Sequence, residues 1–306
     1  MNNTFKNSIE IKGGLSKKKV FRKIENKIKK IIIDFSEDKK DFNNFLNIYK
    51  ILKSIDISIP KIYEVYFNRN LIVMEDFGDE TFDKLFDHND FYNLIKIAID
   101  NLIVIQNSLI IKDISKLEKY SIYNLKMELS EFVDYYIPYK QISNFSEKEF
   151  YQCWNNIYKS QKFEFSSFVH KDYEFINLFF LTKNTKHFKC GIIDFQSAYR
   201  GFIGWDLFSI LENPRINFTR KYNEDLIKYY YKNVNININF NSFRCQYYLL
   251  NLARLTRLLG RWIKLFKSQK NKEYLNYVNS TESRIIACLT NIQNNKLIEI
   301  YDKVLK

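Results

Sequence analysis

The chain of 306 residues is poor in glycine, proline, cysteine and histidine, and each shortage excludes something. Its 7 Gly and 3 Pro leave no Gly- or Pro-rich linker between domains. Its 4 Cys contain no C-x-x-C pair and its 3 His add little, so zinc and redox chemistry are excluded and reduced thiols are expected. No apolar run approaches the roughly 20 residues that span a bilayer. The N-terminal residues lack a signal-peptide pattern, so a cytoplasmic protein without a membrane partner is expected.

Positive charge is abundant, and the formal net charge is +13. A basic protein can bind nucleic acid or anionic lipid. Here the basic residues are spread along a chain that is also rich in Asn, Ile, Phe and Tyr, as an A+T-rich genome would produce. Nucleic acid is therefore the less favoured partner. The content of 46% hydrophobic residues predicts a folded protein with a large core.

The periodicity of apolar residues divides the chain into a strand-rich part and a helical part. Strands are predicted at 8–25 (two, around a turn at Gly13 and Gly14), 28–35, 57–67 and 71–77, with a helix at 38–55. After residue 78, helices are predicted at 89–111, 116–137, 146–162, 222–234, 243–268 and 281–300. Strand-like sequence there is confined to 166–195. The pattern predicts an α+β protein with two lobes, 1–77 and 78–306.

Polar residues interrupt the apolar sequence where the strands of 166–195 meet. His170, Asp172 and Asn177 form H-x-D-x-x-x-x-N, and the apolar GII that follows ends in Asp194, within D-F-Q. Phosphoryl transfer needs one carboxylate to orient the acceptor hydroxyl, and a carboxylate with an amide to hold Mg²⁺. Each residue alone could be a turn or cap residue. Both motifs, in this order and spacing, favour a kinase.

HKDYEFIN and IIDFQSAYRGFIGWDLFSIL resemble the aminoglycoside phosphotransferase-like kinases, whose fold is related to that of protein kinases. IKGGLSKKKVFRKIE resembles their nucleotide-covering hairpin, and LIVMEDFGDETFDKLF resembles the strand and hinge that join the lobes. LARLTRLLGRWIKLFKSQKNKEYLNYV is similar to a segment of the anomeric kinases of N-acetylmuramate and N-acetylglucosamine. The resemblance implies ATP and Mg²⁺ as cofactors and a small molecule, an amino sugar above all, as substrate.

The resemblance also implies roles for individual residues. Asp172 becomes the catalytic base, braced by His170, and Asn177 and Asp194 become Mg²⁺ ligands. Asp206 in GWDL would support the catalytic loop. The residues implied at the nucleotide are Glu75 and Phe77 beside the adenine, and Gly13, Gly14, Ser16 and Lys17 near the phosphates. The third strand, IIIDF, lacks the lysine that in such kinases pairs with the α- and β-phosphates. Lys17, Lys18, Lys29 and Lys30 are the candidates to replace it.

The acceptor is the open question of the sequence. The residues around Glu174 depart from the sugar-kinase pattern, and an aminoglycoside, choline or another alcohol are alternatives. Arg254 and Arg257 belong to a basic helix face with Arg261 and Lys264, for which a solvated surface and a contact to an anionic substrate group are both open. A catalytically silent nucleotide-binding protein and a nucleic-acid-binding protein are the rival classes. The oligomeric state is not predicted. Tyr and Phe within 225–248 are expected in the core.

Overall fold

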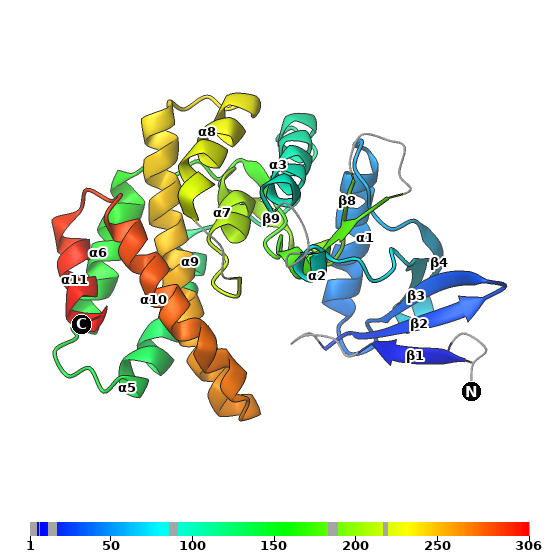
Figure 1. Cartoon of the computed structure of the whole chain (residues 1–306), viewed down its shortest axis with the longest axis horizontal. Coiled ribbons are helices and arrows are strands. Elements are labelled where there is room, and N and C mark those ends of the chain that lie inside the picture. Colours follow the sequence, from blue (N-terminus) through cyan, green and yellow to red (C-terminus); the bar gives the residue numbers. More distant parts are fainter. Residues whose placement is uncertain are drawn as a thin grey trace. The chain divides into compact units, whose positions relative to one another are not determined.

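The protein, in a computed structural model, forms two compact units that interleave in sequence (Figure 1). The first comprises Met1–Lys116 and His170–Tyr199, and the second Leu117–Val169 and Arg200–Lys306. The residues that the structure describes are 5, 7–11, 17–85, 91–182, 189–216 and 220–305. The predicted lobes, 1–77 and 78–306, stay a prediction.

A five-stranded antiparallel sheet with the order β1-β2-β3-β5-β4 forms the N-terminal part of the first unit. Its strands are β1 (Ser8–Ile11), β2 (Lys19–Glu25), β3 (Ile28–Asp34), β4 (Ile62–Tyr66) and β5 (Leu71–Glu75). Alternate residues of β2 and β3 point to opposite faces, so Val20 opposite Ile33 and Arg22 opposite Ile31 share one face. All five strands confirm the pattern predicted from the sequence.

Helix α1 (Lys39–Lys53) confirms the predicted first helix. It begins where the side chain of Asp38 accepts a hydrogen bond from the backbone N–H of Asp41, a helix N-cap. Its apolar stripe is buried and consists of Phe42, Phe45, Ile48 and Leu52.

A β-hairpin and two further helices complete the first unit. Strands β7 (Leu178–Phe180) and β8 (Cys190–Ile192) are antiparallel, with Leu178 opposite Ile192. Helix α2 (Phe82–Leu85) follows the sheet, and α3 (Phe91–Ser108) packs against β8. The loops at the ends of this hairpin carry the two predicted motifs.

The second unit is helical and is built around the long α9 (Phe240–Gln269). The other helices are α4 (Ile122–Glu131), α5 (Ile137–Tyr139), α6 (Glu147–Ser160), α7 (Trp205–Leu211), α8 (Asn223–Asn233), α10 (Asn276–Leu289) and α11 (Asn295–Leu305). Strands β6 (Ser167–Val169) and β9 (Tyr199–Gly201) pair in a small sheet. Tyr230, Phe243 and Tyr247 are fully buried, which confirms the predicted aromatic core.

Glycine allows α9 to approach the backbone that follows α4. A Cβ atom on Gly260 would lie 2.0 Å from the carbonyl oxygen of Glu131 and 2.4 Å from the backbone nitrogen of Phe132. Backbone atoms cannot swing aside as a flexible side chain can. The absence of a side chain at this position therefore sets the separation between the two segments.

Two details of the predicted helices are wrong. The single helix at 281–300 is two helices, α10 and α11, because Asn294 caps the second one by accepting from the N–H of Leu297 at 2.9 Å. The helix predicted from residue 116 begins at Ile122, after the N-cap Ser121. Strands after residue 78 were predicted only within 166–195, so β9 (Tyr199–Gly201) was not predicted. No helix of the described residues is long and apolar enough to cross a membrane.

Candidate active site

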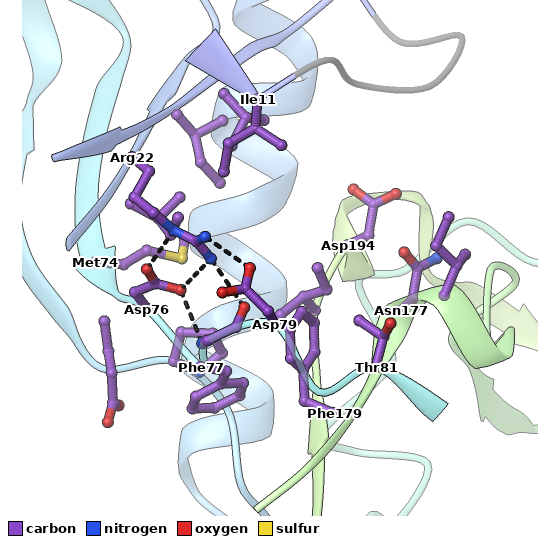
Figure 2. Close-up of a pocket in the computed structure, with 18 of the residues that line it drawn as sticks. Ile11, Arg22, Met74, Asp76, Phe77, Asp79, Thr81, Asn177, Phe179 and Asp194 are labelled. Carbon is purple, nitrogen blue, oxygen red and sulfur yellow. Dashed lines mark hydrogen bonds and ion pairs between the residues drawn. The ribbon is translucent and has the colours of Figure 1, made fainter. Parts of the chain in front are cut away.

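A cavity of about 360 Å³ lies within the first unit, bounded by the sheet, the segment after β5 and the β7–β8 hairpin (Figure 2). The sheet lines it with apolar side chains, among them Val20, Ile31 and Ile33. The volume lies in the range of sites for small organic ligands. The apolar wall can therefore receive a flat, apolar part of a ligand, such as a nucleobase.

One end of the cavity holds an arginine bound to the segment after β5, which links the sheet to α2. Arg22 contacts the carboxylate of Asp76 at 2.6 Å, that of Asp79 at 2.7 Å and the carbonyl oxygen of Gly78 at 2.9 Å. Figure 2 shows the guanidinium reaching from β2 to Asp76 and Asp79. Since the Asp76 side chain is 2% exposed, this carboxylate is held by a partner and serves to fix the segment.

Glu75 and Phe77 both line the cavity, as the interpretation of this segment as a hinge requires. The Glu75 carboxylate accepts from the N–H of Lys61 at 3.1 Å, which ties β5 to the start of β4. The Phe77 ring packs 5.9 Å from the Phe179 ring, centroid to centroid. A Cβ atom on Gly191 would lie 2.6 Å from the Phe77 ring. Gly191 is therefore needed so that β8 can pass under the aromatic ring.

The loop between His170 and Asn177 is closed by its own hydrogen bonds. The carbonyl oxygen of Asp172 accepts from the side-chain nitrogen of Asn177 at 2.8 Å and from the N–H of Glu174 at 2.9 Å. Tyr173 anchors the loop to α3, since its hydroxyl donates to the carbonyl of Ala98 at 3.0 Å. The Asp172 side chain thus projects from a loop whose backbone is fixed at several points.

His170 joins this loop to the strand that carries Asp194. It is fully buried, and its Nε2 lies 3.0 Å from the carbonyl oxygen of Ile193. Burial lowers the pKa of His170 to about 4, although the carboxylate of Asp194 favours the protonated form. The ring is neutral near pH 7, so Nε2–H donates to the carbonyl oxygen of Ile193 and ties the two loops together.

Asp194 is held by two side chains at the other end of the cavity. The ammonium of Lys18 forms an ion pair with its Oδ1, and the side-chain nitrogen of Gln196 donates to the same oxygen at 2.9 Å. Burial alone would raise the pKa of Asp194, but the charge of Lys18 and these two hydrogen bonds hold that pKa below its usual value. Asp194 is therefore a carboxylate, able to bind a cation, at any physiological pH.

Both loops contain a residue with left-handed backbone. Lys171, next to the predicted base, has φ of 76°, and Asp194 has φ of 65°. Such values are uncommon for residues other than glycine, although aspartate tolerates them. A conformation of this kind persists where surrounding contacts hold it. For Asp194 one such contact is the Phe195 ring, which stacks on Phe45 of α1 with centroids 4.7 Å apart.

A model of the phosphotransferase enzyme family matches residues 8–236, a range that contains the cavity and both loops. The chain belongs to the phosphotransferase enzyme family. This match confirms the family predicted from the two motifs, and with it the prediction of a phosphotransferase enzyme.

Two relatives are N-acetylmuramate/N-acetylglucosamine kinases. The one from Caulobacter vibrioides is 24% identical over 236 residues, 74% of this chain, and the one from Pseudomonas putida is 21% identical over 254 residues, 80% of this chain. The matched regions span 65% and 72% of these relatives. The solved structure of a Plasmodium vivax ethanolamine kinase matches with a TM-score of 0.58 at 10% identity, over 94% of this chain and 84% of that one. This likeness confirms the predicted kinase-like α+β fold.

The residues of this phosphotransferase fit a divalent cation at the Asp194 end of the cavity. Asp194 offers a charged carboxylate, and Asn177 lines the same cavity. Because the nitrogen of the Asn177 amide is bound to the Asp172 carbonyl, its oxygen is the atom left to serve as a ligand. Among the described residues no group of three or more His, Cys, Asp or Glu side chains could hold a metal. Phosphate oxygens of a nucleotide would have to complete the coordination.

The other predicted site residues lie in three settings. Gly13, Gly14 and Ser16 lie outside the described residues, and Lys17 is exposed at the edge of that segment. Asp206 is 2% exposed at the start of α7 in the second unit. Glu174 is half-buried, and its backbone takes part in the hydrogen bonds of the catalytic loop. The roles predicted for these residues stay predictions.

The solvated surface considered for the basic face of α9 is wrong for Arg254, which is 2% exposed. Arg261 and Lys264 keep part of their side chains in solvent, 33% and 41%, and bind the carboxylate of Glu131, the last residue of α4, at 2.7 and 3.3 Å. Arg261 and Lys264 of α9 are therefore held against the end of α4. A contact of Arg254 or Arg257 with substrate stays a prediction.

Sequence reasoning missed three residues that shape the site. Arg22 and Tyr173 contact partners 54 and 75 positions away, and no local pattern marks such pairs. Gln196 orients Asp194 from only two positions away, and the D-F-Q motif contained that signal, since an amide can reach back to the preceding carboxylate.

Proposed function

We propose that this chain is an ATP- and Mg²⁺-dependent kinase that phosphorylates a hydroxyl group of a small molecule. The observation that carries the proposal is the pairing of two loops in one unit. His170, Asn177 and Ile193 tie the loop of Asp172 to the loop of Asp194, and Asn177 and Asp194 line a cavity of a size that suits a nucleotide. The family match supports the same reaction class.

The proposed reaction assigns one task to each side chain. Asp172 orients the acceptor hydroxyl and takes its proton as the new O–P bond forms and the bond from the γ-phosphorus to the leaving ADP oxygen breaks. Asn177 and Asp194 would hold Mg²⁺, which neutralises phosphate charge when bound. His170 keeps the two loops in register. Glu75, Phe77 and the apolar residues of the sheet would receive the adenine.

The acceptor that we propose is an amino sugar, phosphorylated at its anomeric hydroxyl. The two relatives named above are kinases of N-acetylmuramate and N-acetylglucosamine, and the segment from Leu252 to Val278 resembles that subgroup. At 24% and 21% identity the names support the reaction more strongly than the substrate.

The test is phosphate transfer from Mg-ATP by the purified chain to N-acetylglucosamine, N-acetylmuramate, aminoglycosides and choline. Asp172→Asn should lower the rate about 100- to 10,000-fold, because the base is lost. Asp194→Asn should lower it as strongly, whereas Asp56→Asn, at an exposed carboxylate of the same unit, should leave it unchanged. Full turnover by Asp172→Asn would contradict the proposed mechanism.

A matched sugar pair tests the position. N-acetylglucosamine should be phosphorylated and its 1-O-methyl glycoside, which lacks the anomeric hydroxyl, should not. Phosphorylation of the glycoside would place the reaction at another hydroxyl. Stabilisation by Mg-ATP without transfer to any acceptor would support a silent nucleotide-binding protein, and steeply salt-dependent binding to DNA or RNA would support the nucleic-acid alternative.

A further inference from the structure

The third strand of the sheet presents isoleucines to the cavity, at the strand where kinases of this fold are expected to place a phosphate-binding lysine. Ile31 and Ile33 line the cavity, and Lys30 points to the opposite face. There Lys30 binds Glu25 at 2.8 Å and lies over the ring of Tyr63. Lys29 is exposed near the start of the strand. Neither lysine of β3 is placed to contact a ligand beside Asp194.

Lys18 reaches the cavity from the neighbouring strand. It lies two residues before Val20, which is opposite Ile33, so its side chain emerges diagonally across from Ile33 on the same face. A lysine side chain easily spans that diagonal, about 7 Å between backbones. The Lys18 side chain is only 12% exposed, and its ammonium is bound to Asp194.

The other cations of the cavity have different settings. Among the described lining residues, Arg22 and Lys84 also carry positive charge. Arg22 is bound to Asp76 and Asp79, and Lys84 donates to the carbonyl oxygen of Asp79 at 3.1 Å. Both side chains therefore bind the segment after β5, whereas Lys18 is next to the residue that would hold the metal.

We infer that Lys18 is the phosphate-binding lysine of this enzyme, moved from the third strand to the start of the second. An ammonium has three N–H donors, so Lys18 can keep one hydrogen bond to Asp194 while it donates another to a phosphate oxygen. Asp41, in the first turn of α1, lies within electrostatic range of both Lys18 and Asp194. This inference rests on the proposed function.

A purely structural role for Lys18 makes a different prediction, and adenosine separates the two. Adenosine has the base and ribose of ATP but no phosphate. If Lys18 binds phosphate, Lys18→Met should weaken the binding of Mg-ATP about 10- to 100-fold, as for the loss of a charge-assisted hydrogen bond, and leave adenosine affinity unchanged. ATP in EDTA completes the separation, because Asp194 would act on ATP through Mg²⁺. If Lys18 only holds the loop of Asp194, Lys18→Met should weaken Mg-ATP but leave the affinity for ATP in EDTA unchanged, whereas a phosphate-binding Lys18 requires that ATP in EDTA is weakened as well.

The experiment is calorimetric titration of Mg-ATP and adenosine into wild type, Lys18→Met, Lys18→Arg and Lys19→Met. Lys18→Arg keeps the charge and should restore most of the Mg-ATP affinity. Lys19 is the matched control, since it is 55% exposed and contacts Glu37 at 3.7 Å. ATP in EDTA is titrated into the same proteins. An unchanged affinity for ATP in EDTA in Lys18→Met, equal losses for Mg-ATP and adenosine, or no loss for Mg-ATP would overturn the inference. Wild type that binds Mg-ATP no better than adenosine would instead count against the proposed function.

Discussion

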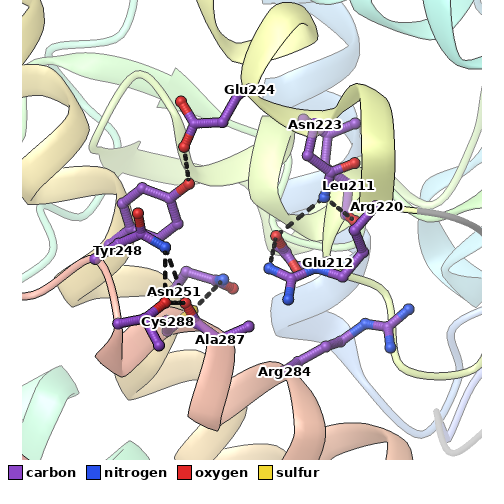
Figure 3. A network of polar contacts seen from close by, with 12 residues as sticks. Leu211, Glu212, Arg220, Asn223, Glu224, Tyr248, Asn251, Arg284, Ala287 and Cys288 are labelled. Carbon is purple, nitrogen blue, oxygen red and sulfur yellow. Dashed lines mark hydrogen bonds and ion pairs between the residues drawn. The ribbon is translucent and has the colours of Figure 1, made fainter.

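The two units of this phosphotransferase place paired charges in opposite surroundings. In the first unit, Lys18 with Asp194 and Arg22 with Asp76 and Asp79 line a cavity. In the second unit, Glu212 is fully buried, 2.7 Å from Arg220 and 3.1 Å from the side-chain nitrogen of Asn223 (Figure 3). A pair that lines a cavity can exchange one partner for a ligand, whereas the carboxylate of Glu212 is enclosed by protein and keeps the partners that it has.

Arg284 adds a second cation beside the buried carboxylate. It projects from α10, is 7% exposed, and donates to the carbonyl oxygen of Ile216 at 3.0 Å (Figure 3). Burial lowers the pKa of Arg284, and the charge of Glu212 acts in the opposite direction. Glu212 thus compensates two guanidinium groups inside the helical unit. The difference teaches that the Lys18–Asp194 pair of the first unit is placed where a ligand can reach it, whereas the charges around Glu212 hold α7, α8 and α10 together.

The largest effect is expected where the buried pair is broken. Glu212→Gln should lower the free energy of unfolding by about 4 kcal/mol, because the buried Arg284 and the part-buried Arg220 lose a fully buried counter-charge. Asp194→Asn, at the cavity, should change it by less than about 1 kcal/mol, although it removes activity. Urea unfolding at pH 7 measures both. Glu149→Gln is the control, since Glu149 is 49% exposed and its pair with Lys296 contributes about 1 kcal/mol at most. Similar losses at Glu212 and Asp194 would break the comparison.

A second contrast concerns one glycine in each unit. Gly260→Ala should destabilise the protein by about 3 kcal/mol, since its Cβ would meet backbone atoms of Glu131 and Phe132. Gly191→Ala should cost about 1 kcal/mol, because the Phe77 ring can turn away, but the displaced ring should weaken adenosine binding. Thermal unfolding and adenosine titration test the pair. An adenosine affinity that is unchanged in Gly191→Ala would argue against Phe77 at the nucleobase.

The third and smallest effect is a loss of folding stability at low pH, which tests whether His170 is buried as a neutral ring. Its pKa is about 4 in the folded protein and near 6.5 when exposed, so below pH 6.5 the unfolded chain takes up a proton that the folded chain excludes. Stability should therefore fall as the pH drops from 6.5 toward 4, by about 2 kcal/mol between pH 7 and pH 5. Asp194 and Lys18 are the charged groups that act on the ring.

Urea unfolding at pH 7 and pH 5 in metal-free buffer measures this loss. His170→Gln, which keeps an N–H donor for the carbonyl of Ile193, should lack the His170 contribution, so its loss should be about 2 kcal/mol smaller than that of wild type. Equal losses in the two proteins would show that His170 is not buried as a neutral ring.

Several elements could be predicted from sequence because their signals are local. The apolar run Ile31–Ile33 of β3, and the stripe of Phe42, Phe45 and Leu52 in α1, report burial through neighbours a few positions away. The break between α10 and α11 was missed because the apolar period continues on both sides of it. There a single capping side chain, Asn294, determines where the second helix starts.

The sequence alone determined the motifs around Asp172, Asn177 and Asp194 and the class of chemistry, since spacing along the chain carries that information. Tertiary structure was needed to choose Lys18 among four lysines, because its partner Asp194 is 176 positions away and follows a strand of a different sheet. The same holds for Arg22, which binds the segment after β5, and for the basic face of α9, whose surroundings depend on α4. Local periodicity reports which face of an element is buried, but only folding determines what that face meets.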